Sequence, residues 1–302
     1  MSIVIGVIEE GLIYAIMALG LYITYKILDF PDLSVDGTFP MGAAVTAMVI
    51  LKGVHPAAAL FISFFAGMAA GCITGLIHVK LKVRDLLSGI IVMTALYSVN
   101  LRIAGKSNLP IFSKETIFDN SFLNTAVPEA VKPWTVSILL LVIVGICKVL
   151  LDLFLKTRAG YLLRAAGDNE VLVTSLAKNK GTVKIIGLAL ANGFVALSGS
   201  VYCQQKGFFE ISTGTGTMVI GLASVIIGTK LLKRFGAVKT TTAVVFGSIV
   251  YKGCVSAAIA LGMAASDLKL ITAVLFLVIL VASNQKERRK THSLVKSYSK
   301  IL

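Results

Sequence analysis

The chain has 302 residues, of which 56% are hydrophobic and 15% are charged, and its mean hydropathy is +0.88. A soluble domain is closer to half apolar and about a quarter charged. The apolar residues also come in long runs, and each crossing of a bilayer takes about 20 such residues. These features exclude a soluble globular enzyme, a disordered protein and a secreted disulfide scaffold. They indicate an all-α, polytopic membrane helical bundle.

The formal net charge is +14, but the basic residues do not form one patch. They lie in short segments between apolar runs, as expected where cytoplasmic loops of a membrane protein collect lysine and arginine. We therefore expect membrane lipid around the chain and no nucleic-acid partner. The cysteines and histidines are isolated along the chain and lack metal-site spacing, so no metal and no cofactor is predicted.

Hydropathy predicts about nine membrane spans, with a range of about eight to ten because a re-entrant segment is easily miscounted. In chain order they cover residues 3–26, 37–52, 56–79, 86–104, 134–155, 182–204, 212–231, 238–263 and 268–284. The tail 285–302 is strongly basic, and a cytoplasmic C-terminus puts most of the 29 basic residues on the cytoplasmic side. Nine crossings then put the N-terminus outside.

The first two expected spans are joined by a polar segment, Leu28–Gly42. It combines three aspartates with helix-breaking residues: Asp29, Asp32, Asp36, Pro31, Gly37, Pro40 and Gly42. Proline and glycine are expected to break the helix, and irregular backbone at membrane depth is tolerated only inside protein or along a water-filled path. The segment therefore predicts a translocation pathway lined by Ser34, Asp36 and Thr38. An ordinary cytoplasmic turn with solvated aspartates is the alternative, and it stays open for Asp29 and Asp32.

An external loop is expected between the fourth and fifth spans, at residues 102–132. It mixes apolar and aromatic side chains with balanced charges. A loop of this length usually carries structure or a task of its own. Docking of a soluble external partner and capping of the bundle are both compatible with its composition.

The cytoplasmic segment 158–182 is long but too polar to cross the membrane. Tyr161–Ala166 is predicted to form a helix that ends at Gly167. Asp168 is then expected to cap a second helix, because aspartate is a preferred N-cap and negative charge is favoured in a first turn. Asn169 and Glu170 would occupy that first turn.

In the second of these helices, Leu172 and Leu176 share one face at i, i+4 spacing. The predicted product is a short projecting helix with an apolar ridge edged by charge. Such a helix suits a groove on a cytoplasmic partner. The alternative is an interfacial helix that lies on anionic lipid.

Glycines recur at helix-packing spacing in Gly67–Gly71–Gly75 and Gly193–Ser198–Gly199, which predicts close contacts between helices. The glycine-rich stretch Gly214–Gly228 is not followed by the Gly-Lys-Ser/Thr of a phosphate-binding loop. No such motif occurs in the chain, so any use of ATP is expected on a different polypeptide.

The chain resembles the permease subunits of ABC importers of the branched-chain amino acid and ribose type. The likeness rests on GLIYAIMALGL at Gly11–Leu21, DLSVDG at Asp32–Gly37, RAAGDNEVLVTSLAKN at Arg164–Asn179 and GLASVIIG at Gly221–Gly228. The Arg164–Asn179 segment is similar to the cytoplasmic coupling segment of the family. The form DLSVDGTF looks closest to the subgroup described as tryptophan/tyrosine permeases. The fuller EAA consensus of the maltose-type importers is absent, so docking contacts are not transferable from those proteins.

This resemblance implies a cytoplasmic ABC ATPase subunit in two copies, an extracytoplasmic solute-binding lipoprotein and a second permease copy, most simply in a homodimer. It implies a role in ATPase coupling for Arg164, Gly167, Asp168, Asn169, Glu170, Leu172 and Leu176. It also implies a role in the pathway for Ser34, Asp36 and Thr38.

The sequence is therefore interpreted as one transmembrane permease domain, residues 1–302, of a cell-membrane importer for a small solute. An amino acid with an aromatic or branched-chain side chain is the expected solute. The chain is not expected to be an enzyme. The rival interpretations are an ion-coupled secondary transporter, which leaves the projecting segment unexplained, and a lipid-modifying membrane enzyme, which lacks convergent histidine and acidic groups.

Overall fold

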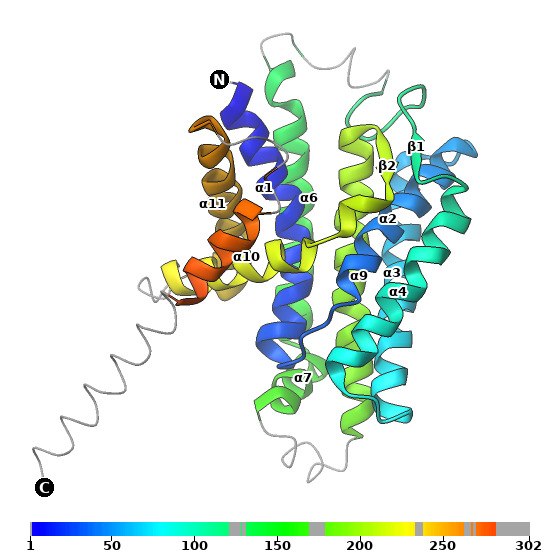
Figure 1. Ribbon diagram of the computed structural model, residues 1–302, viewed down its shortest axis with the longest axis vertical. Helices are drawn as coiled ribbons and strands as arrows, with labels where there is room; N and C mark the ends of the chain where they lie inside the picture. The colour runs from blue at the N-terminus through cyan, green and yellow to red at the C-terminus, as the bar shows by residue number, and fades with distance from the viewer. Residues whose placement is uncertain are drawn as a thin grey trace, which may run out of the picture.

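The computed structural model describes residues 2–120, 128, 131–168, 179–232, 238–262, 267 and 270–281. In Figure 1 most long helices run side by side along the long axis of the molecule, and a small two-stranded sheet lies at the upper end. In the first third of the chain the helices are α1 Ser2–Leu21, which continues as a π-helical turn over Tyr22–Ile27, α2 Val35–Leu51, α3 Pro56–Lys80 and α4 Asp85–Ala104.

The rest of the described chain contains further helices and the two strands. These are β1 Asn108–Pro110, α6 Lys132–Leu155, α7 Arg158–Asp168, α9 Lys180–Lys206, β2 Phe208–Glu210, a 3-10 turn at Ile211–Gly214, α10 Thr217–Leu231 and α11 Thr240–Ala260. A last short apolar helix covers Leu270–Val281.

Seven helical stretches among the described residues are long and apolar enough to cross a membrane. Two shorter apolar helices, Val35–Leu51 and Leu270–Val281, occupy the positions of the second and ninth predicted spans. The prediction of an all-α, polytopic membrane protein is confirmed. The helix boundaries follow hydropathy closely because a lipid-facing segment has to satisfy its backbone hydrogen bonds internally and has to be apolar along its whole length.

Helix α9 is the central element of the bundle, and it packs against α1, α2 and α3. The predicted packing glycines explain how it comes so close to α3, because Gly67, Gly71 and Gly75 all face α9. A side chain at Gly71 would overlap the carbonyl group of Leu188. The prediction that these glycines form helix contacts is therefore confirmed, as expected where small residues let helix backbones approach each other in a membrane.

Part of the predicted external loop is folded onto the bundle. Strand β1 pairs antiparallel with β2, with Leu109 opposite Phe209, and Ile111 and Phe209 are fully buried. The sheet thus ties the chain after α4 to the chain after α9. Residues 121–127 of the same loop lie outside the described residues.

The boundaries predicted for the cytoplasmic helix are wrong. Helix α7 covers Arg158–Asp168 among the described residues, so it begins three residues earlier than predicted, and Gly167 lies inside it. Gly167 is required for packing, because a side chain there would overlap the carbonyl of Ile27. The sequence alone does not distinguish a glycine that lets another backbone approach closely from a glycine that ends a helix.

Candidate functional site at the helix break

The chain leaves helical geometry between the end of the π-helical turn at Ile27 and the start of α2 at Val35. The break is shorter than predicted, because Gly37, Pro40 and Gly42 lie within α2. Pro40 is close to the start of this helix, so its missing N–H frees only the carbonyl of Asp36.

Two helices at this break are too short to cross the hydrocarbon layer alone. Helix α2 has 17 residues, and α10 has 15 when the 3-10 turn that precedes it in the stretch Ile211–Leu231 is not counted. At 1.5 Å per residue these helices are roughly 25 and 22 Å long, against a layer of about 30 Å. Figure 1 shows both helices beginning partway along the long helices, and α10 crosses them at a steep angle. Half-helices of this kind put polar helix ends inside a bundle.

One carboxylate holds the first turn of α10. Asp36 accepts hydrogen bonds from the backbone N–H groups of Gly216 at 2.9 Å and Met218 at 2.8 Å, and from the Thr217 hydroxyl at 3.0 Å. Asp36 also lies in the first turn of α2. Negative charge is favourable at a helix N-terminus, so this single side chain stabilises both half-helices.

A buried polar network joins the break to α9. The Asn192 amide donates to Asp32 at 2.7 Å, and its oxygen accepts from the hydroxyls of Thr38 at 2.7 Å and Ser34 at 3.2 Å. The backbone N–H of Ser34 donates to the other carboxylate oxygen of Asp32 at 2.9 Å. All four side chains are fully buried. A buried carboxylate is tolerated here because hydrogen bonds replace its water.

A third contact connects the break to α4. The Asn100 amide donates to the carbonyl of Gly37 at 2.9 Å. The Asn100 oxygen is buried and has no partner among the described residues. The start of α2 is therefore held from three sides, by α4, α9 and α10.

The structure brings the three predicted pathway residues, Ser34, Asp36 and Thr38, together at one point. Ser34 and Thr38 are fully buried against Asn192, whereas Asp36 is half-buried against α10. Of the two aspartates whose setting was open, Asp29 is exposed and Asp32 is fully buried.

Three side chains that hold this site were not predicted: Asn100, Asn192 and Thr217. An asparagine inside the apolar run of α9 was the available signal, because polar side chains within a span need partners. Its partners lie about 150 positions earlier in the chain, and only the fold brings them together.

The predicted coupling residues are described only in part. Arg164 is exposed on α7 and, with Tyr161 and Lys239, lines a hollow of about 360 Å³ between α7, α6 and the start of α11. Gly167 packs on Ile27. Asp168 is described only as a backbone position of α7, and the remaining predicted coupling residues lie outside the described residues: Asn169, Glu170, Leu172 and Leu176.

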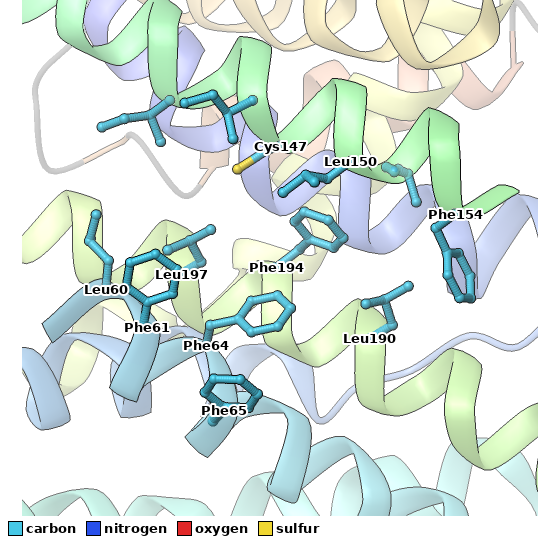
Figure 2. A pocket seen from close by; sticks show the side chains of 13 residues that line it. Leu60, Phe61, Phe64, Phe65, Cys147, Leu150, Phe154, Leu190, Phe194 and Leu197 are labelled. Atoms are coloured by element: carbon cyan, nitrogen blue, oxygen red, sulfur yellow. The ribbon is translucent and has the colours of Figure 1, made fainter. Parts of the chain in front are cut away.

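A larger hollow of about 430 Å³ lies between α3, α6 and α9 (Figure 2). Its lining is apolar and includes Phe61, Phe64, Phe65 and Phe154. Phe61 and Phe65 are strongly exposed, so this surface belongs to the hydrocarbon side of the bundle. An amino acid would find no partner for its charged groups there. Among the described residues no group of three or more His, Cys, Asp or Glu side chains is arranged to hold a metal ion.

Comparison with known proteins gives a consistent result over nearly the whole chain. Residues 3–283 match the family described as the permease component of branched-chain amino acid transport systems. The chain is 47% identical over 284 residues to a tyrosine transport system permease protein of Clostridioides difficile, covering 94% of this chain and 92% of that protein.

Two further relatives are more distant. The chain is 32% identical to the uncharacterized protein RP368 of Rickettsia prowazekii, over 95% of this chain and 100% of that protein. It is 22% identical to the ribose import permease protein RbsC of Escherichia coli K12, over 93% of this chain and 85% of that protein. No solved structure matches the chain significantly. With its membrane-spanning helices and a family match over almost its full length, the chain belongs to the branched-chain amino acid transport system permease family.

Proposed function

We propose that this chain is the transmembrane permease subunit of an ABC importer that moves an aromatic amino acid across the cell membrane, with tyrosine as the main proposed solute. The observation that carries the proposal is the 47% identity, over nearly the full length of both chains, to a tyrosine transport permease. The proposed assembly has two copies of this permease in a homodimer, two cytoplasmic ATPase subunits and an extracytoplasmic solute-binding lipoprotein.

The proposed topology has nine crossings in one permease domain of residues 1–302, with the N-terminus outside and the C-terminus in the cytoplasm. Its support is the basic charge of the loops at one end of the bundle, such as Lys80–Arg84 and Lys156–Arg164. Helix α7 lies at this end (Figure 1). The segment 158–182 is then the coupling segment, 102–132 the external loop and 285–302 the cytoplasmic tail.

The proposed coupling route runs from α7 to the helix break. Gly167 of α7 packs against the carbonyl of Ile27, the residue just before the break. The side chains of Leu163 and Leu28 both lie against Gly187 of α9. A displacement of α7 by the ATPase therefore acts directly on the segment that ends in Asp36. In the proposed cycle, ATP binding shifts the population between inward-open and outward-open arrangements of the bundle.

The test is purification of the tagged chain from its native cell in mild detergent, followed by reconstitution with labelled tyrosine. We expect a complex of two permeases and two ATPases whose tyrosine uptake requires ATP and the binding protein. Glu170→Lys is expected to weaken co-purification of the ATPase, because it reverses a charge in the coupling segment. Uptake by the lone chain, driven by a Na⁺ or H⁺ gradient, would instead identify a secondary transporter.

A further inference from the structure

A cluster of paired charges lies between α1, α9 and α11, at the end of the bundle away from α7. Glu10 accepts from Lys206 at 2.8 Å and from Lys252 at 3.2 Å. Lys252 has a 14% exposed side chain, whereas those of Glu10 and Lys206 are 35% and 30% exposed. All three residues belong to membrane-spanning helices. Ionisable side chains are costly there and mark functional sites unless another reason for them is found.

Ion pairing with Glu10 alone does not explain why the cluster contains two lysines. A single carboxylate is neutralised by one ammonium group, but Glu10 has two lysine partners. Glu9, the preceding residue on α1, balances the second lysine formally, but both ammonium groups lie against Glu10, whose side chain remains about one-third exposed. Exposure of such groups to lipid is unfavourable, so the open side of the cluster is expected to face water or the second permease copy.

Two acceptor side chains adjoin the charge cluster in sequence. Glu9 precedes Glu10 on α1, and Gln205 precedes Lys206 on α9. Glu9 accepts from the Ser137 hydroxyl at 3.2 Å and from the Gln205 amide at 3.3 Å. Both of these donors are neutral. The Gln205 oxygen is buried and has no partner among the described residues. An acceptor without a donor is expensive to bury, so this oxygen is suited to a ligand that donates.

Aromatic rings form the inner wall of the cluster. The Lys252 ammonium lies 4.1 Å from the ring centre of Tyr14, and the Lys206 ammonium lies 6.0 Å from that of Tyr202. Tyr14 stacks on Phe39 with ring centres 5.8 Å apart, and Tyr202 lies 5.6 Å from Phe39. Phe39 follows Thr38 on α2, so the aromatic wall adjoins the helix break directly.

We propose that this cluster is a recognition site for an aromatic amino acid zwitterion within the permease itself. Lys206 and Lys252 bind the carboxylate, and Glu9 with the Gln205 oxygen accepts hydrogen bonds from the ammonium group. The ring of the solute packs beside Tyr202. The proposal rests on the proposed function and adds to it a solute class that the permease, and not only the binding protein, selects.

The experiment uses the permease–ATPase complex with its binding protein in proteoliposomes, and it measures KM and kcat for tyrosine uptake. For Lys206→Gln and for Glu9→Gln we expect KM to rise about tenfold or more, since each variant removes a hydrogen bond between oppositely charged groups, which is one of the stronger kinds. Lys206→Arg retains the charge and should restore most of the affinity. Lys52→Gln, an exposed lysine at the same end of the bundle, is the matched control and should have no effect.

A second measurement covers variants that fail to assemble. It compares binding of tyrosine, tyramine and 3-(4-hydroxyphenyl)propionate to the unmodified permease–ATPase complex without the binding protein. Both analogues, each lacking one charged group, should bind about tenfold more weakly than tyrosine or worse. Equal binding of the three compounds, or an unchanged KM in assembled Lys206→Gln and Glu9→Gln complexes that take up tyrosine, would overturn the recognition site alone. Failure of the unmodified complex to take up any aromatic amino acid would overturn the proposed function as well.

Discussion

At the scale of the residue, the carboxylate of Asp36 accepts three hydrogen bonds from the start of α10 while it occupies the first turn of α2. Hydrogen bonds to an ionised group are stronger than neutral ones, and here they replace capping by a side chain of the helix itself. The residue before α10 is Gly216, with φ of +86°, which has no side chain to act as a cap. The start of α10 therefore depends on a residue about 180 positions away.

Replacement of Asp36 by alanine should lower the free energy of unfolding by about 3 kcal/mol, because it leaves the donors of Gly216, Thr217 and Met218 without their shared acceptor. Thermal unfolding of the purified complex in detergent measures this change. Asp29→Asn is the matched control, since Asp29 is exposed and asparagine tolerates its φ of +50°. Equal stability of the Asp36→Ala and Asp29→Asn variants would contradict the capping role.

At the scale of the element, α7 is a short amphipathic helix that lies against the end of the bundle. Leu163 and Ala166 are buried, whereas Tyr161 and Arg164 are exposed beside the 360 Å³ hollow. The inward face meets Ile27 through Gly167. A helix with this arrangement offers one face to a partner while the other contacts the break, which suits the proposed coupling role.

Gly167→Ala should separate α7 from Ile27, because the new methyl group would overlap the Ile27 carbonyl. Overpacking of this kind lowers the stability of the fold by about 1–3 kcal/mol. Because α7 is displaced, the variant transporter should move less tyrosine per ATP hydrolysed. The ratio of uptake to hydrolysis in proteoliposomes is the measurement. Gly145→Ala in α6 is the control: nothing lies within 4 Å of its added methyl group, so coupling should be unchanged. A normal ratio in Gly167→Ala would remove α7 from the coupling route.

At the scale of the whole molecule, α9 is the shared packing partner of the first three helices. Its own glycines extend this packing, because Gly193 faces Phe64 and Met68 of α3, and Gly199 faces the carbonyl of Phe39 on α2. Ser198 between them donates to the carbonyl of Ile13 on α1 at 2.7 Å. The predicted packing role of this motif is thus confirmed, and the motif serves three different helices.

Gly71→Leu should prevent α3 from docking on α9, because even a methyl group at Gly71 overlaps the Leu188 carbonyl. We expect a loss of more than about 3 kcal/mol, seen as little folded protein after size-exclusion chromatography. Ser63 and Thr46, which share a hydrogen bond of 2.8 Å across α2 and α3, should lose their contact in the same variant. Full recovery of folded Gly71→Leu protein would show that α3 and α9 need not approach so closely.

Much of the fold was predictable because lipid imposes a simple rule on each span. The predicted spans 56–79 and 86–104 differ by a residue or so from the observed Pro56–Lys80 and Asp85–Ala104. The same rule says little about interruptions. Pro40 was expected to break a helix that in fact runs through it, and Gly167 was expected to end one that includes it. In both cases the local residue types are compatible with a helix that ends there and with one that continues. Packing against another element decides which of the two forms.

By itself the sequence determined that this is an all-α membrane protein, which helices pack through glycines and which polar segment carries Ser34, Asp36 and Thr38. Those conclusions follow from local composition, since hydrocarbon selects apolar runs and close packing selects small residues. Only the tertiary structure decided that Asp32 is buried while Asp29 is exposed, that Asn192 joins the break to α9 and that Glu10 pairs with lysines of two other helices. The reason is physical: a buried polar group needs a partner, and the identity of that partner depends on which distant segments the fold brings together.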